Sequence, residues 1–246
     1  MNTIGAHTLA NADPPDEDTY AIPDGLTLRD HNALKKAEQE KFERIRKARH
    51  ADRPSAVFNR QSTNFLSRYT AIGTSNLRTL ADNINFAKSI VIGGGTLVLR
   101  RNNILHRVLH QVSTSTHLLL FVGGCDATDD VKLTIRPPHI INELVACFAD
   151  LLETRARSPN ADGPLIIILL LPRHLTTDET ITAELQEINS KLKAVITAAR
   201  EKHGINVTWI DTQHLTREVD FFHEDGKRLT LRGTGRLATD LSLIHI

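Results

Sequence analysis

The sequence has few of the features on which small secreted proteins and membrane proteins depend. Only two cysteines occur among 246 residues, Cys125 and Cys147, and both lie inside apolar segments. This favours reduced thiols in a cytoplasmic protein over a disulfide framework. No charged-then-apolar leader begins the chain, and the longest uninterrupted apolar run, residues 165–171, is far too short to span a bilayer. We therefore expect no contact with a membrane.

The net charge of +1 conceals two oppositely charged segments near the N-terminus. Residues 1–30 hold six acids against one arginine, a net of −5, and residues 31–60 hold nine Lys and Arg against four acids, a net of +5. The simplest interpretation is a solvated arm. The alternative is that residues 31–60 bind the phosphates of RNA or DNA.

Three regions follow from composition and periodicity. Residues 1–64 form an extension, disordered and acidic over 1–30 and then basic with a helical stretch over 31–50. Residues 65–241 form the compact domain, since a hydrophobic content of 40% suffices for a core. The final residues, 241–246, resemble the translation of a sequencing-library adapter, so we interpret them as a non-native scar.

Strand and helix patterns alternate through the compact domain. Helical spacing of apolar residues occurs over 139–153 and 177–200. Short, continuously apolar runs predict strands that are buried on both faces, as in parallel sheets; they are residues 69–72, 89–92, 117–122, 165–171 and 206–210. The sequence therefore predicts an α/β fold, a three-layer α/β/α sandwich of flavodoxin-like type around a central, mostly parallel five-stranded sheet.

Small or polar residues follow the predicted strands, at the edge of a parallel sheet where ligands bind. Ser75 follows the first run and begins a predicted helix, as a simple N-cap or as a reactive hydroxyl. Glycines 93–95 follow the second run and offer backbone N–H groups, without the residues of a P-loop. After the third run come Cys125 and three carboxylates whose spacing fits no EF-hand, so we expect neither a metal nor another cofactor (Asp126, Asp129, Asp130).

Taken together, these segments resemble the SGNH/GDSL hydrolase superfamily over roughly residues 67–241. The segment AIGTSNLRTL is similar to the first block of the family and implies a nucleophile at Ser75. The segment IGGGTL is similar to the second block, and implies that Gly94, or Gly95 beside it, contributes to the oxyanion hole. The resemblance extends to esterase-like domains of retroelement proteins, which LLLPR…INSKL within residues 169–192 also resembles.

The two remaining blocks complete the likeness. FVGGCDAT is similar to the third block and puts Cys125 where the family has the oxyanion-hole asparagine. HEDGKRLTLRGTGRLATDL is similar to the last block, and maps the triad aspartate to Asp225 and the triad histidine to Arg228. The resemblance implies an SGNH-type sandwich and an ancestral activity on acyl or acetyl esters.

The chain departs from the family at three of these positions. A histidine takes the proton from the serine and returns it to the leaving group, and arginine cannot do this because its pKa stays above about 12. Cys125 offers a weak S–H donor in place of an amide N–H, and loss of one oxyanion donor typically costs about 100–1000-fold in rate. The aspartate of the first block is replaced by Thr74. We therefore predict a pseudoenzyme, inactive or weak.

Two alternatives remain open at the sequence level. A relocated base would make the protein a weak serine esterase, and His223, two residues before Asp225, is the best candidate, with His174 after another strand as a second. Otherwise Arg228 forms an ion pair with Asp225 and closes the old site, leaving a non-catalytic module for nucleic-acid binding or assembly.

Overall fold

The computed structural model describes residues 63–129, 134–171, 179–217, 221–223 and 228–243. They all belong to the second of the two compact units into which the chain divides, residues 55–246. The disordered segment predicted over 1–30 and the helical stretch predicted over 31–50 lie outside the described residues.

The predicted parallel sheet is confirmed. Its strands have the order β2-β1-β3-β6-β7, and every neighbouring pair is parallel. Each strand falls within or beside one of the five apolar runs: β1 (Thr70–Gly73), β2 (Lys88–Val91), β3 (Leu118–Phe121), β6 (Leu165–Ile168) and β7 (Val207–Ile210). The two central strands β3 and β6 are buried along their whole length, as continuous apolarity predicts.

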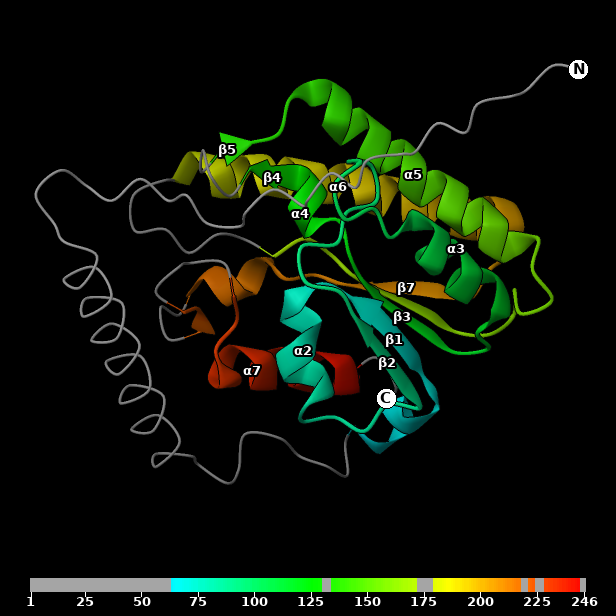
Figure 1. The fold of residues 1–246 in the computed structure, drawn as a ribbon. Helices are drawn as coiled ribbons and strands as arrows, with labels where there is room; N and C mark the ends of the chain where they lie inside the picture. The colour runs from blue at the N-terminus through cyan, green and yellow to red at the C-terminus, as the bar shows by residue number, and fades with distance from the viewer. Residues whose placement is uncertain (1–62, 130–133, 172–178, 218–220, 224–227, 244–246) are drawn as a thin grey trace, which may run out of the picture. The chain divides into compact units, whose positions relative to one another are not determined.

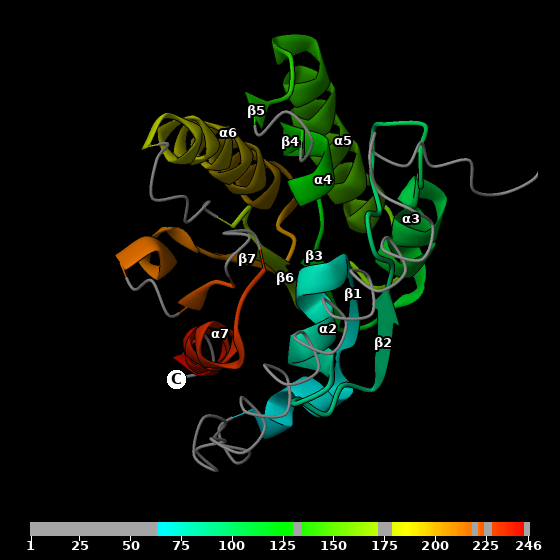
Figure 2. The same ribbon diagram turned by 60° about the vertical axis from the view of Figure 1, so that its left-hand side comes forward.

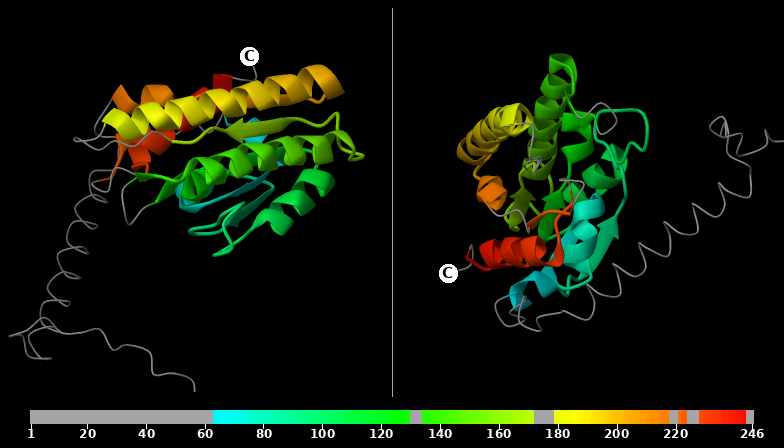
Figure 3. Two further views of the ribbon diagram at one scale, coloured as in Figure 1. Left: turned by 90° about the horizontal axis from the view of Figure 1, so that it is seen from above. Right: turned by 90° about the vertical axis from the view of Figure 1, so that its left-hand side faces the viewer.

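Helices cover both faces of the sheet and make the predicted three layers. One face carries α2 (Ser75–Ala81) and α7 (Leu231–Leu243), which pack on a core with Leu119 and Ile166 of the central strands. The other carries α3 (Leu105–Thr114), α5 (Pro138–Ala156) and α6 (Glu179–His203), over a core with Leu120 and Ile167. Figures 1 and 3 show α3, α5 and α6 side by side on that face.

Several short elements have no counterpart in the sequence prediction. They are η1 (Asn64–Arg68), α4 (Gly124–Ala127), the antiparallel pair β4 (Thr128–Asp129) and β5 (Thr134–Ile135), and η2 (Gln213–Arg217). Each is five residues or shorter, so no periodic pattern has room to repeat.

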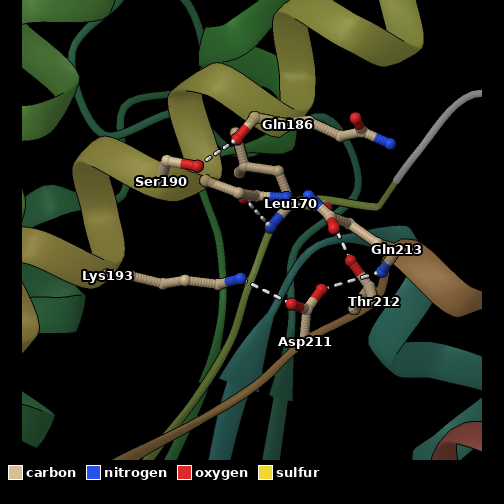
Figure 4. A network of polar contacts seen from close by, with 8 residues as sticks. Leu170, Gln186, Ser190, Lys193, Asp211, Thr212 and Gln213 are labelled. Carbon is tan, nitrogen blue, oxygen red and sulfur yellow. Dashed lines mark hydrogen bonds and ion pairs between the residues drawn. The ribbon is translucent and has the colours of Figure 1, made fainter.

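The fourth strand is shorter than its apolar run, which is a correction to the prediction over residues 165–171. The strand ends at Ile168, and side chains then take over the pairing. Buried Asn189 bonds Leu170 twice, accepting from its N–H and donating to its carbonyl, at 2.9 Å each. The buried Thr212 hydroxyl donates to the same carbonyl at 2.7 Å (Figure 4). The two segments LLLPR and INSKL are therefore in direct contact.

A buried arginine organises the amino ends of the central strands. Arg155 of α5 is fully buried, and burial lowers the pKa of its guanidinium from the usual value. Its nitrogens donate to four backbone carbonyls, at 3.0 Å for Val112, 2.9 Å for Thr116 and Gly163, and also to Ser115. These carbonyls belong to the end of α3 and to the segments that enter β3 and β6, so one side chain ties three parts of the chain together.

Candidate active site

At the carboxyl edge of the sheet, hydrogen bonds join the first of the four family-like segments to each of the other three. The strands are parallel, so their carboxyl ends lie along one edge, where α2, α4 and the end of β2 meet (Figure 2). The bonds run from Ile92 N–H to the Gly73 carbonyl at 2.9 Å, from Thr74 N–H to the Phe121 carbonyl at 3.2 Å, and from Leu229 N–H to Asn76 Oδ1 at 3.3 Å.

Ser75 is the first residue of α2 and is partly exposed. Thr74 before it is extended, with φ −90° and ψ −162°, so the chain turns sharply from strand to helix at the serine. Among the described residues, the Ser75 hydroxyl makes no hydrogen bond to a histidine ring. Ser75 thus begins a helix directly after a strand, the position at which we predict the nucleophile.

In the glycine turn after β2, the two candidate oxyanion-hole donors, Gly94 and Gly95, have different surroundings. The Gly95 N–H already donates to the Ile92 carbonyl at 3.2 Å, and Gly95 is buried. Gly94 is exposed and has φ +66°, in the left-handed region that favours glycine. Gly94 therefore remains the better candidate for an oxyanion donor.

Asp126 holds this turn against the third segment, a role that the sequence analysis missed. Its side chain is fully buried, and its carboxylate accepts the N–H groups of Leu97, Val98 and Leu99 at 2.8, 2.9 and 3.3 Å. Burial raises the pKa of Asp126 above its ordinary value, against these N–H groups and Arg136, which lower it. The neighbour of Cys125 is therefore an anchor for the turn.

The last segment is described only in part. Asp225 and His174 lie outside the described residues, so the ion pair proposed between Asp225 and Arg228 remains a prediction. Arg228 is exposed, and its carbonyl accepts the His223 N–H at 2.8 Å. That backbone bond places His223 and Arg228 opposite each other, one residue before Leu229 reaches Asn76.

The two thiols have different surroundings, and we predict that they therefore differ in their reactivity toward an alkylating reagent. Cys147 on α5 is buried, and desolvation raises its pKa to about 11, so about one thiol in a thousand is ionised at pH 8. Cys125 on α4 is partly exposed. At pH 8 iodoacetamide should alkylate Cys125 in the native protein and Cys147 only after unfolding, as mass spectrometry of the Cys125→Ser and Cys147→Ser variants would show. Fast native labelling of Cys125→Ser would contradict this.

Only the comparison with solved structures found matches for this chain. The sequence matches no protein-family model and no curated protein. Among solved structures, an acetyl esterase variant crystallised with acetate aligns with a TM-score of 0.52 at 12% identity, over 72% of this chain and 96% of that one. An acetylxylan esterase from Geobacillus stearothermophilus aligns with a TM-score of 0.48 at 12% identity, over 72% and 92% of the two chains. A GDSL-like lipase from Bacteroides ovatus aligns with a TM-score of 0.48 at 13% identity, over 70% of this chain and 50% of that one.

The first of these alignments shows that the chain shares the α/β/α fold of that acetyl esterase. At this identity the likeness concerns the fold alone. Within the described ranges, no helix is long and apolar enough to cross a bilayer, and no group of three or more His, Cys, Asp or Glu is placed to hold a metal ion.

Proposed function

We propose that the protein is a GDSL-type serine-hydrolase domain of retroelement origin whose ester-hydrolysing activity is lost or weak. The observation that carries the proposal is the joining of the family-like segments around Ser75, in a site where the histidine position is Arg228. The substrate class that fits the ancestry is an acyl or acetyl ester. The retroelement origin rests on the likeness of the blocks and of the two segments joined by Asn189.

The chemistry of the site explains the expected loss. Attack by Ser75 on an ester carbonyl requires a group that accepts the hydroxyl proton, and the guanidinium of Arg228 is already fully protonated. The tetrahedral oxyanion then has a backbone N–H at Gly94, but a thiol at Cys125 where an amide would donate. The site therefore retains a nucleophile and part of an oxyanion hole, and lacks the proton acceptor.

Restoring the missing groups tests the proposal. Hydrolysis of p-nitrophenyl acetate should be no faster with wild type than with Ser75→Ala. Arg228→His should raise it, and adding Cys125→Asn should raise it further, by about 100-fold if the amide donates to the oxyanion. The double variant combined with Ser75→Ala is the matched control and should return to the background.

The outcomes separate the alternatives. Wild-type hydrolysis that disappears in Ser75→Ala and in His223→Gln, but persists in Arg228→Ala, would establish a weak esterase with His223 as its base and overturn the pseudoenzyme. Failure of both repaired variants, with unchanged folding, would overturn the assignment of Arg228 to the histidine position.

A second candidate function is binding of RNA or DNA through residues 31–60. The observation that favours it is their net charge of +5 over thirty residues. Deletion of residues 31–60 should then lower the affinity for an oligonucleotide and flatten its dependence on salt. Equal affinity with and without these residues would exclude a role for this arm.

A further inference from the structure

A long stretch of the compact unit contains no acidic residue. From residue 83 to residue 125, 43 residues, there is no Asp or Glu, but there are four basic residues, Lys88, Arg100, Arg101 and Arg107. From residue 126 to the end, eighteen acids face fourteen Lys and Arg, a net of −4. Charge in this unit is therefore segregated along the chain.

The structure places this stretch at one side of the sheet. The strand β2 is an edge strand, and the chain continues from it through a turn over residues 92–104 into α3 (Figure 2). All four basic side chains are exposed. His106 and His110 are exposed too, and lie one turn apart on α3 beside Arg107. We call Lys88, Arg100, Arg101 and Arg107 the basic edge.

Two of these arginines sit on a turn that is fixed from within. The Thr96 hydroxyl lies 2.9 Å from the Leu99 carbonyl and 2.7 Å from the Arg101 carbonyl. The Asn103 amide donates to the carbonyls of Leu97 and Leu99 at 3.0 and 3.1 Å. The Asp126 carboxylate accepts three backbone N–H groups of the same turn. The backbone of Arg100 and Arg101 is therefore ordered before any ligand arrives, which lowers the entropic cost of binding.

Several basic side chains elsewhere in the unit have acidic partners. Arg136 pairs with Asp129, Arg157 with Glu153, Lys191 with Glu187 and Lys193 with Asp211. Within the part of the chain that the structure describes, no member of the basic edge forms such a pair. Like charges gathered without counter-charges raise the local positive potential and attract polyanions.

We propose that the basic edge binds the phosphate backbone of nucleic acid, without base preference. Three of its four members are arginines, whose planar fork matches two phosphate oxygens. Leu243 is the exposed large apolar side chain of the described residues, so none of their Phe, Tyr or Trp rings is fully exposed as a platform on which bases stack. Recognition therefore runs through phosphates, which makes it dependent on salt and indifferent to sequence. The surface is distinct from residues 31–60 and uses none of the catalytic positions.

The test compares two triple variants of the full chain with the same change of charge. Arg100→Ala/Arg101→Ala/Arg107→Ala removes the three arginines of the basic edge, and Arg157→Ala/Lys191→Ala/Lys202→Ala removes three exposed cations, one at the C-cap of α5 and two on α6. Anisotropy of a labelled oligouridylate of about 20 nucleotides is measured over about 50–300 mM KCl. The basic-edge variant should bind about 10-fold or more weakly at low salt, and its slope of log K against log salt should fall by about 2. The other variant should match wild type.

Three results decide the matter. The same loss in both triple variants would reduce the effect to net charge and overturn the proposal. Displacement of the oligonucleotide by poly-glutamate as readily as by unlabelled RNA would overturn it in favour of an acidic protein partner. A loss that persists when residues 31–60 are also deleted would support it, and would separate this surface from the arm. Equal melting temperatures confirm that all variants are folded.

Discussion

Replacement of Arg155 by methionine is expected to lower the free energy of unfolding by about 4 kcal/mol. Methionine fills much of the same space but donates no hydrogen bond. The carbonyls of Val112, Ser115, Thr116 and Gly163 would lose their charged donor. A buried carbonyl left without a partner costs about 1–3 kcal/mol, and the bonds to Val112 and Ser115 are buried while the other two are partly buried. Relaxation and entry of water would recover part of that sum, which is why the expected loss is smaller than four full penalties.

Urea unfolding followed by circular dichroism gives the measurement. The matched control is Arg157→Met, at the C-cap of the same helix, because this exposed arginine pairs with Glu153 one helical turn before it and contributes little. Arg155→Lys should recover part of the loss, since an ammonium group retains the charge but cannot reach four carbonyls. Equal midpoints for Arg155→Met and Arg157→Met would show that the buried guanidinium does not stabilise the fold.

The second large effect is expected at Asp126. Alanine there removes the acceptor of three backbone N–H groups in the turn after β2, and should cost about 3 kcal/mol. Asparagine should cost less, because its one amide oxygen still accepts a backbone N–H. Some cost remains, since the amide NH₂ would face a backbone N–H, which is also a donor. Asp150→Asn is the control, since Asp150 is exposed on α5. Thermal melting of the three variants makes the comparison, and an unchanged Asp126→Ala would contradict the anchoring role.

The same carboxyl should leave a mark on the pH dependence of stability. Burial raises the folded-state pKa of Asp126 above 3.8, so the folded protein binds this proton more tightly than the unfolded chain does. Its contribution to stability is therefore complete below pH 3.8 and declines as the pH rises through the folded-state value. Asp126→Asn should lack this decline. The free energy of unfolding is measured against pH for wild type and for Asp126→Asn, and the difference between the two gives the contribution of this carboxyl group.

The sheet could be predicted because its information is local. Runs such as residues 117–122 are apolar at every position, and a strand buried on both faces requires this. The helix α3 was missed although Leu105, Val108, Leu109 and Val112 have helical spacing. The end of the fourth strand could not be predicted, because it depends on Asn189, nineteen residues away in sequence.

The candidate site divides in the same way. Ser75, Gly94 and Cys125 follow strands, as the sequence predicted, and were selected because their segments resemble the blocks of the family; their roles stay predictions. Asp126 was considered only as a metal ligand, because its three partners lie 27 to 29 residues away and offer only backbone N–H groups. Three of the carbonyls that Arg155 binds are likewise 39 to 43 residues distant. Nearly every residue carries the same backbone N–H and carbonyl groups, so the residue types in the sequence do not indicate which of them a side chain will bind.

The position of Arg155 has a consequence for how such a protein can change over time. Its four carbonyls precede the strands β3 and β6, whereas Ser75 in α2 and Cys125 in α4 lie at the opposite edge, and Arg228 precedes Leu229, which is bonded to α2. Substitutions that abolish chemistry at one end of the sheet therefore leave the main polar clamp at the other end intact. A lineage released from selection for catalysis would keep a folded scaffold, open to new surface properties.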